Sequence, residues 1–112
     1  MGLDQYAFIR VEDGEGKDDA LIMQWRKHSN LEGRMSDLYH ARGGTSEFNC
    51  VELQLFAEDL EKLESEHRNL EPASGFFWGQ STLEDVEDTQ AFIDAAKVAL
   101  KNGHKIIYTS WW

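Results

Sequence analysis

Cysteine, proline and long apolar runs are all scarce in this chain of 112 residues. Cys50 is the single cysteine, so no disulfide can form within the chain, which fits a reducing compartment. No apolar run approaches the roughly 20 residues that span a bilayer. The N-terminal segment has no basic region followed by a long apolar stretch, so we expect no signal peptide. These scarcities predict a cytoplasmic protein that does not use a membrane.

Positive charge is also scarce. There are 11 Lys and Arg residues against 21 Asp and Glu residues, which gives a formal net charge of -10. Binding to nucleic-acid phosphates needs a positive surface, so we expect no direct nucleic-acid binding. Residues 47–96 are rich in acids and contain only two bases, Lys62 and Arg68. One part of the surface should therefore be strongly negative.

Apolar and aromatic residues, by contrast, are plentiful. Hydrophobic residues make up 41% of the chain and aromatic residues 12%, which is too many for a disordered acidic chain. A chain of this length is typical of one domain and can bury enough surface to fold without a metal or a disulfide. We predict a single domain over residues 1–112.

Alternating apolar residues predict four strands. The strands cover residues 3–12, 20–26, 49–55 and 105–111. In the second of them, the alternation places Leu21, Met23 and Trp25 on one face.

Three helices are predicted between these strands. Ser29 and Glu32 fit a capping box at the start of the first helix, which ends before Gly43. The second runs from Phe56 to Leu70 along a stripe of apolar residues, and the third begins at 81 or 82 and ends near 102. The order β-β-α-β-α-loop-α-β predicts an α+β domain whose helices cover one face of a mostly antiparallel sheet.

Several short blocks resemble a family of small phage-encoded proteins of unknown function, which also occur in marine viral sequence. The blocks are "MGLDQY", "WRKHSNLEG", "NCVELQL", "SGFFWG" and "YTSWW". The resemblance implies a virus-infected cell as the setting and implies no mechanism. Some members are labelled phosphoglycerate kinase, but this chain has no GxxxxGK[ST] loop and is too short for two lobes.

The segment "WRKH" is a candidate ligand site, since it joins a strand to a helix. Arg26 and Lys27 carry positive charge, His28 titrates near neutral pH, and the following helix start offers free amides. A phosphorylated or carboxylated ligand would suit these groups. Alternatively, the two bases solvate an edge of the sheet or pair with acidic helices. Glu52 joins the candidates because an inward carboxylate would need a partner such as Arg26 or His28.

Other reactive residue types give weaker indications. Cys50 has no neighbouring base, so we interpret it as a packing residue. The four histidines share no close helical spacing, so we expect no metal site, and no cofactor motif is present. His67 lies on the apolar stripe of the second helix and is expected to be partly buried.

The loop "SGFFWG" places Phe76, Phe77 and Trp78 between two glycines. One reading is an exposed aromatic platform for a partner. The other is a lid that packs beside Trp25 and Trp111, because each buried aromatic removes roughly 150–250 Å² from water.

We therefore expect a non-enzymatic binding or regulatory protein that acts on a host or viral protein, as a monomer or a homo-oligomer. A variant of this hypothesis is a DNA mimic whose helical carboxylates imitate phosphates. The alternative is a small enzyme or ligand-binding protein that uses Arg26, Lys27 and His28. A pocket lined by Arg26, His28 and Glu52 would favour the alternative, and a flat surface with clustered carboxylates would favour the partner hypothesis.

Overall fold

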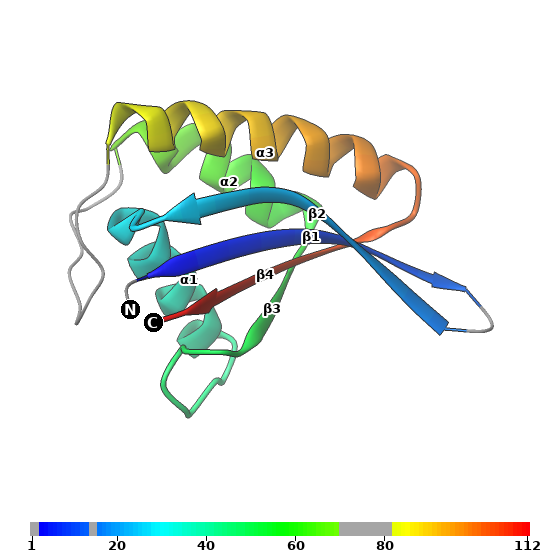
Figure 1. Ribbon diagram of the computed structural model, residues 1–112, viewed down its shortest axis with the longest axis horizontal. Helices are drawn as coiled ribbons and strands as arrows, with labels where there is room; N and C mark the ends of the chain where they lie inside the picture. Colours follow the sequence, from blue (N-terminus) through cyan, green and yellow to red (C-terminus); the bar gives the residue numbers. More distant parts are fainter. Residues whose placement is uncertain (1–2, 14–15, 70–81) are drawn as a thin grey trace.

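A four-stranded antiparallel sheet and three helices form the described part of the chain (Figure 1). The computed structural model describes residues 3–13, 16–69 and 82–112. The elements are β1 (Asp4–Asp13), β2 (Gly16–Arg26), α1 (Ser29–Ala41), β3 (Glu52–Leu55), α2 (Ala57–Glu66), a short 3₁₀ helix (His67–Asn69), α3 (Leu83–Lys101) and β4 (Lys105–Trp111). They make one α+β domain, and the predicted order of strands and helices is confirmed.

The strand order in the sheet is β2-β1-β4-β3, so the first and last strands of the chain lie at its centre. Gln5 of β1 pairs with Trp25 of β2 and with Ser110 of β4, while Leu53 of β3 pairs with Tyr108 of β4. Side chains at these positions point toward the helices, which lie on one side of the sheet (Figure 1). The opposite side, called here the open face, is covered by none of the described helices.

The core lies between the sheet and the helices. The Trp25 ring packs edge-on against Phe92 of α3, with 5.2 Å between ring centroids. It also lies 6.1 Å from the Tyr108 ring, which stacks on Phe48 at the same separation. These contacts join β2, β4 and α3 around fully buried side chains.

The predicted face of Leu21 in β2 is wrong. The register shifts between Ala7 and Phe8, where their partners are Met23 and Leu21, so β2 carries an extra residue, Ile22. This β-bulge reverses the alternation. Met23 and Trp25 share one face as predicted, and that face is toward the core, but Leu21 lies beside Phe8 on the open face and is 50% exposed.

Two helix starts differ from the sequence prediction. The residue that caps α1 is His28, without a side-chain hydrogen bond, so the predicted box of Ser29 and Glu32 is wrong. Phe56 precedes α2 and is 46% exposed instead of buried. Its ring lies 5.1 Å from the guanidinium carbon of Arg42, a cation–π contact that keeps it at the surface.

The start of α3 agrees with its prediction. Thr82 Oγ1 accepts a hydrogen bond from the Asp85 amide at 3.3 Å, and Asp85 Oδ2 accepts one from the Thr82 amide at 2.8 Å. Among the helices described, none has the length and apolar character needed to cross a membrane.

Candidate functional site

The "WRKH" residues end β2 and begin α1, but they do not share an environment. Arg26 is exposed, and its Nε lies 4.0 Å from Asp4 Oδ1. Lys27 is also exposed and has a left-handed backbone, with φ of 65°, while its amide donates to the Leu3 carbonyl at 2.9 Å. His28 turns the other way and is 1% exposed. The two bases therefore face water while the histidine belongs to the core.

Glu52 lies on the open face and not beside these residues. Its Oε2 is 2.7 Å from Nη2 of Arg10, and Nε of Arg10 is 2.8 Å from Oδ1 of Asp19. Hydrogen bonds to Asp19 and Glu52 raise the pKa of Arg10 above its ordinary value. Ile107 lies between Arg10 and Glu52 in the register and is 4% exposed, so the ion pairs shield it. The expected pairing of Glu52 with a residue such as Arg26 or His28 is therefore wrong.

The aromatic candidates are also separated. Trp25 is buried, and its Nε1 donates to Thr89 Oγ1 at 3.2 Å. Trp111 is 64% exposed on β4, so a buried cluster that unites it with Trp25 was wrong. The remaining candidates, Phe76, Phe77 and Trp78, lie outside the described residues.

The predicted packing cysteine is exposed as well. Cys50 precedes β3 with φ of 61° and does not contribute to the core, because the strand begins only at Glu52. Its neighbour Asn49 anchors the C-terminus instead. The Asn49 amide donates to the Trp112 carbonyl at 2.7 Å and its Oδ1 accepts from the Trp112 backbone amide at 3.0 Å.

Two buried histidines occupy one end of the helical layer. Burial lowers the pKa of His28 to about 4, an effect that the charge of Asp85 opposes and that of His67 reinforces. His67 is buried as predicted, and its Nε2 lies 2.9 Å from Gln90 Oε1. No group of three or more His, Cys, Asp or Glu side chains suited to a metal ion occurs among the described residues.

Glu32 is a buried carboxylate that the sequence analysis assigned to a helix cap. It is fully buried, and it accepts three hydrogen bonds from β4 and the C-terminal residue. Tyr108 Oη donates to Oε1 at 2.7 Å, and Ser110 Oγ and Trp112 Nε1 donate to Oε2 at 2.6 and 3.2 Å. Burial raises the pKa of Glu32 above its ordinary value, and these hydrogen bonds oppose the shift.

Gln5 extends this network to the start of α1. Its Oε1 accepts from the His28 backbone amide at 2.9 Å, and its Nε2 donates to the His28 carbonyl at 3.0 Å and to Tyr108 Oη at 2.8 Å. Burial raises the pKa of Tyr108 well above its ordinary value, so the hydroxyl keeps its proton. Glu32, Gln5 and Tyr108 have no exposed surface, so the network holds α1 to the sheet and offers no place for a substrate.

A signal for this network was present in the sequence. Tyr108 and Ser110 alternate along the last strand and Trp112 follows at the same spacing, so three donors are presented to the core. Buried donors need acceptors. A carboxylate on a helix that packs against this face was therefore to be expected.

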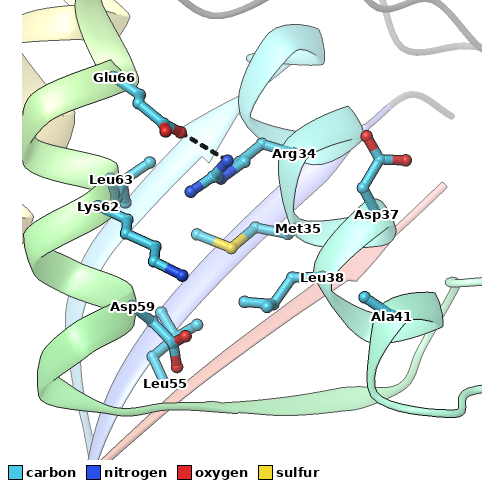
Figure 2. A pocket seen from close by; sticks show the side chains of 10 residues that line it. All are labelled: Arg34, Met35, Asp37, Leu38, Ala41, Leu55, Asp59, Lys62, Leu63 and Glu66. Carbon is cyan, nitrogen blue, oxygen red and sulfur yellow. Dashed lines mark ion pairs between the residues drawn. The ribbon is translucent and has the colours of Figure 1, made fainter.

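The described surface has a groove between α1 and α2, with a volume of about 400 Å³ (Figure 2). Its apolar floor consists of Met35, Leu38, Leu55 and Leu63. Its charged walls consist of Arg34, Asp37, Asp59, Lys62 and Glu66. None of the candidate ligand residues from the sequence analysis lines it.

The outer face of α3 is the second surface of interest. Glu84, Glu87 and Asp94 are exposed along it and Asp88 is half-buried at its edge, and none of the four forms an ion pair with a described residue. The inner side of α3 is different. There Lys97 Nζ lies 2.6 Å from Oε1 of Glu64 on α2, and this contact holds the pKa of Glu64 below its ordinary value.

No family model matches the chain, and it has no match among the curated proteins or the solved structures. The resemblance to small phage-encoded proteins therefore stays a prediction.

Proposed function

We propose that this chain is a non-enzymatic binding protein that acts on a host or viral protein in the cytoplasm of a phage-infected cell. The observation that carries the proposal is the outer face of α3. Four carboxylates line that face without an ion pair to any described residue. Beyond them the same face continues into Ala95 and Val98, which are exposed. Carboxylates beside small apolar groups suit a protein partner with a basic surface.

Electrostatics supports this choice of partner. Like charges that are close together repel one another, and a net charge of -10 adds to that repulsion. A basic partner relieves the repulsion and is steered toward the face by long-range attraction. Proteins that bind nucleic acid carry such basic surfaces, so a DNA mimic is the most specific form of the proposal.

The alternative, a ligand-binding protein or small enzyme built on "WRKH", draws less support. Arg26 and Lys27 are exposed, His28 is buried, and Glu52 is engaged by Arg10 on the open face. Catalysis or ligand capture needs groups that converge on one cavity.

A matched pair of double variants tests the proposal. Glu84→Gln with Glu87→Gln removes two charges from the outer face of α3. Asp37→Asn with Glu47→Gln removes two exposed charges elsewhere. Each tagged protein is incubated with lysate of the infected host, and captured proteins are compared at low and high salt. We expect a basic protein that the wild type captures at low salt, that salt releases, and that the α3 variant loses.

Two further readouts separate the outcomes. For a DNA mimic, added duplex DNA should displace the captured protein, although duplex DNA mixed with the purified chain alone should give no gel shift. Equal loss of capture in both double variants would mean that net charge alone, and not the face of α3, is responsible.

A further inference from the structure

The groove between α1 and α2 is closed at both ends by ion pairs. Arg34 Nη1 lies 2.6 Å from Glu66 Oε2 at one end. At the other end Arg42, just after α1, pairs with Asp59 of α2. Asp59 and Glu66 are seven residues apart, so the span between these ion pairs is about two helical turns, or roughly 10 Å.

The floor of the groove is apolar. Met35 of α1, Leu55 of β3 and Leu63 of α2 are buried there beneath the partly exposed Leu38. A volume of about 400 Å³ lies in the range of pockets that hold small molecules. An apolar group about as long as two helical turns would cover this floor. The contact would remove the apolar surface of the group and that of the floor from water.

Lys62 is a cation on the wall of the groove, beside the apolar floor. It projects from α2 into the gap, as Figure 2 shows, and it has no ion pair with a described residue. Asp37 is the other lining charge without such a pair, but in Figure 2 its carboxylate lies on the side of α1 away from α2. The acids that flank Lys62, Asp59 and Glu66, are already neutralised by the two arginines.

We infer that this groove binds a small amphipathic carboxylate, whose apolar body lies on the floor and whose carboxylate pairs with Lys62. The inference does not depend on the protein partner proposed above, since α3 contributes no residue to the groove. A cation would be repelled by Lys62, and among the described lining residues no unpaired acid is turned toward the gap. A purely apolar molecule would contact the floor but would leave the Lys62 ammonium without a partner in the ligand.

Octanoate is a suitable probe, because it joins a straight apolar chain to one carboxylate. Titration followed by NMR of the methyl groups should shift Met35 and Leu38 in a saturable way. Acetate, which lacks the chain, and octylamine, which reverses the charge, should both bind more weakly. Octanoate that shifts Leu100 instead would place binding in the shallow hollow beside Lys97 and Lys101 and would overturn the inference.

Variants of three charged residues test the role of Lys62. Lys62→Met removes the ammonium but keeps most of the length of the side chain, and it should weaken octanoate binding by about threefold to fivefold, as for an exposed ion pair. Lys62→Arg should restore most of it. Lys101→Met should leave the affinity for octanoate unchanged. Asp37→Asn should leave it unchanged or raise it slightly. Equal affinity of wild type and Lys62→Met would show that the ammonium does not select the ligand.

Discussion

Tyr108 of β4 donates a 2.7 Å hydrogen bond to the buried carboxylate of Glu32 on α1. The direction of the bond is fixed, because Gln5 Nε2 already donates to the same hydroxyl at 2.8 Å. Gln5 is oriented in turn by the His28 backbone amide, which donates to its Oε1. The bonds from Gln5 to Tyr108 and from Tyr108 to Glu32 therefore run in one direction, and Glu32 is their terminal acceptor.

Replacing Glu32 with Gln should destabilise the fold despite the equal size of the two side chains. The new amide nitrogen cannot accept a hydrogen bond, so it must face either Tyr108 or the pair Ser110 and Trp112. We expect a loss of about 1–3 kcal/mol in the free energy of unfolding. Urea unfolding measures it, and Glu61→Gln on the exposed side of α2 should change it by no more than about 0.5 kcal/mol.

A double-mutant cycle with Tyr108→Phe shows whether the hydrogen bond itself is responsible. Residues that share one buried network are coupled, so the double variant should lose less than the sum of the single variants by about 0.5 kcal/mol or more. Additive losses would mean that the two side chains stabilise the fold independently.

The pH dependence of stability should reveal the buried state of His28. Its pKa is about 4 in the folded protein, against about 6.5 when unfolded, so the folded state resists protonation. Its stabilising effect is complete above pH 6.5 and is lost as the pH falls toward 4. Between pH 7 and 5 this group alone should remove about 2 kcal/mol from the free energy of unfolding.

Comparison with His28→Gln isolates that effect. Glu32 acts with the opposite sign, because its raised pKa costs stability as the pH rises above its ordinary value. The dependence of the wild-type free energy of unfolding on pH therefore contains contributions from both groups. In the difference between wild type and His28→Gln, the contribution of Glu32 cancels. The advantage of the wild type should shrink between pH 7 and 5. Parallel curves for the two proteins would contradict the assignment.

Element types and their order could be predicted because apolar periodicity is a local property. Strand order could not, since the position of β1 between β2 and β4 depends on residues about a hundred positions apart, such as Gln5 and Ser110. Leu21 was assigned to the wrong face because one extra residue, Ile22, reverses the alternation. No glycine or proline marks that bulge in the sequence.

The buried polar network was missed because Ser-x-x-Glu has two structural meanings. Ser29 and Glu32 have the spacing of a capping box, yet α1 starts one residue earlier than that box requires, and Glu32 turns into the core. The candidate ligand set failed for a similar reason. Arg26 and His28 are only two residues apart in the sequence, but the end of a strand directs them to opposite environments.

Trp25 and Trp111 provide the last prediction, because the same residue type lies in opposite environments. Trp25 is 1% exposed and contacts Phe92, Tyr108 and Thr89, so Trp25→Ala should cost about 3–5 kcal/mol. Trp111 is 64% exposed, so Trp111→Ala should cost at most about 1 kcal/mol. Far-UV circular dichroism in urea measures both without relying on tryptophan fluorescence. A large loss from Trp111→Ala would mean that this ring is covered in solution. A small loss accompanied by weaker capture of the protein partner would instead place Trp111 in the binding surface, because an exposed indole that does not stabilise the fold is free to be buried by a partner.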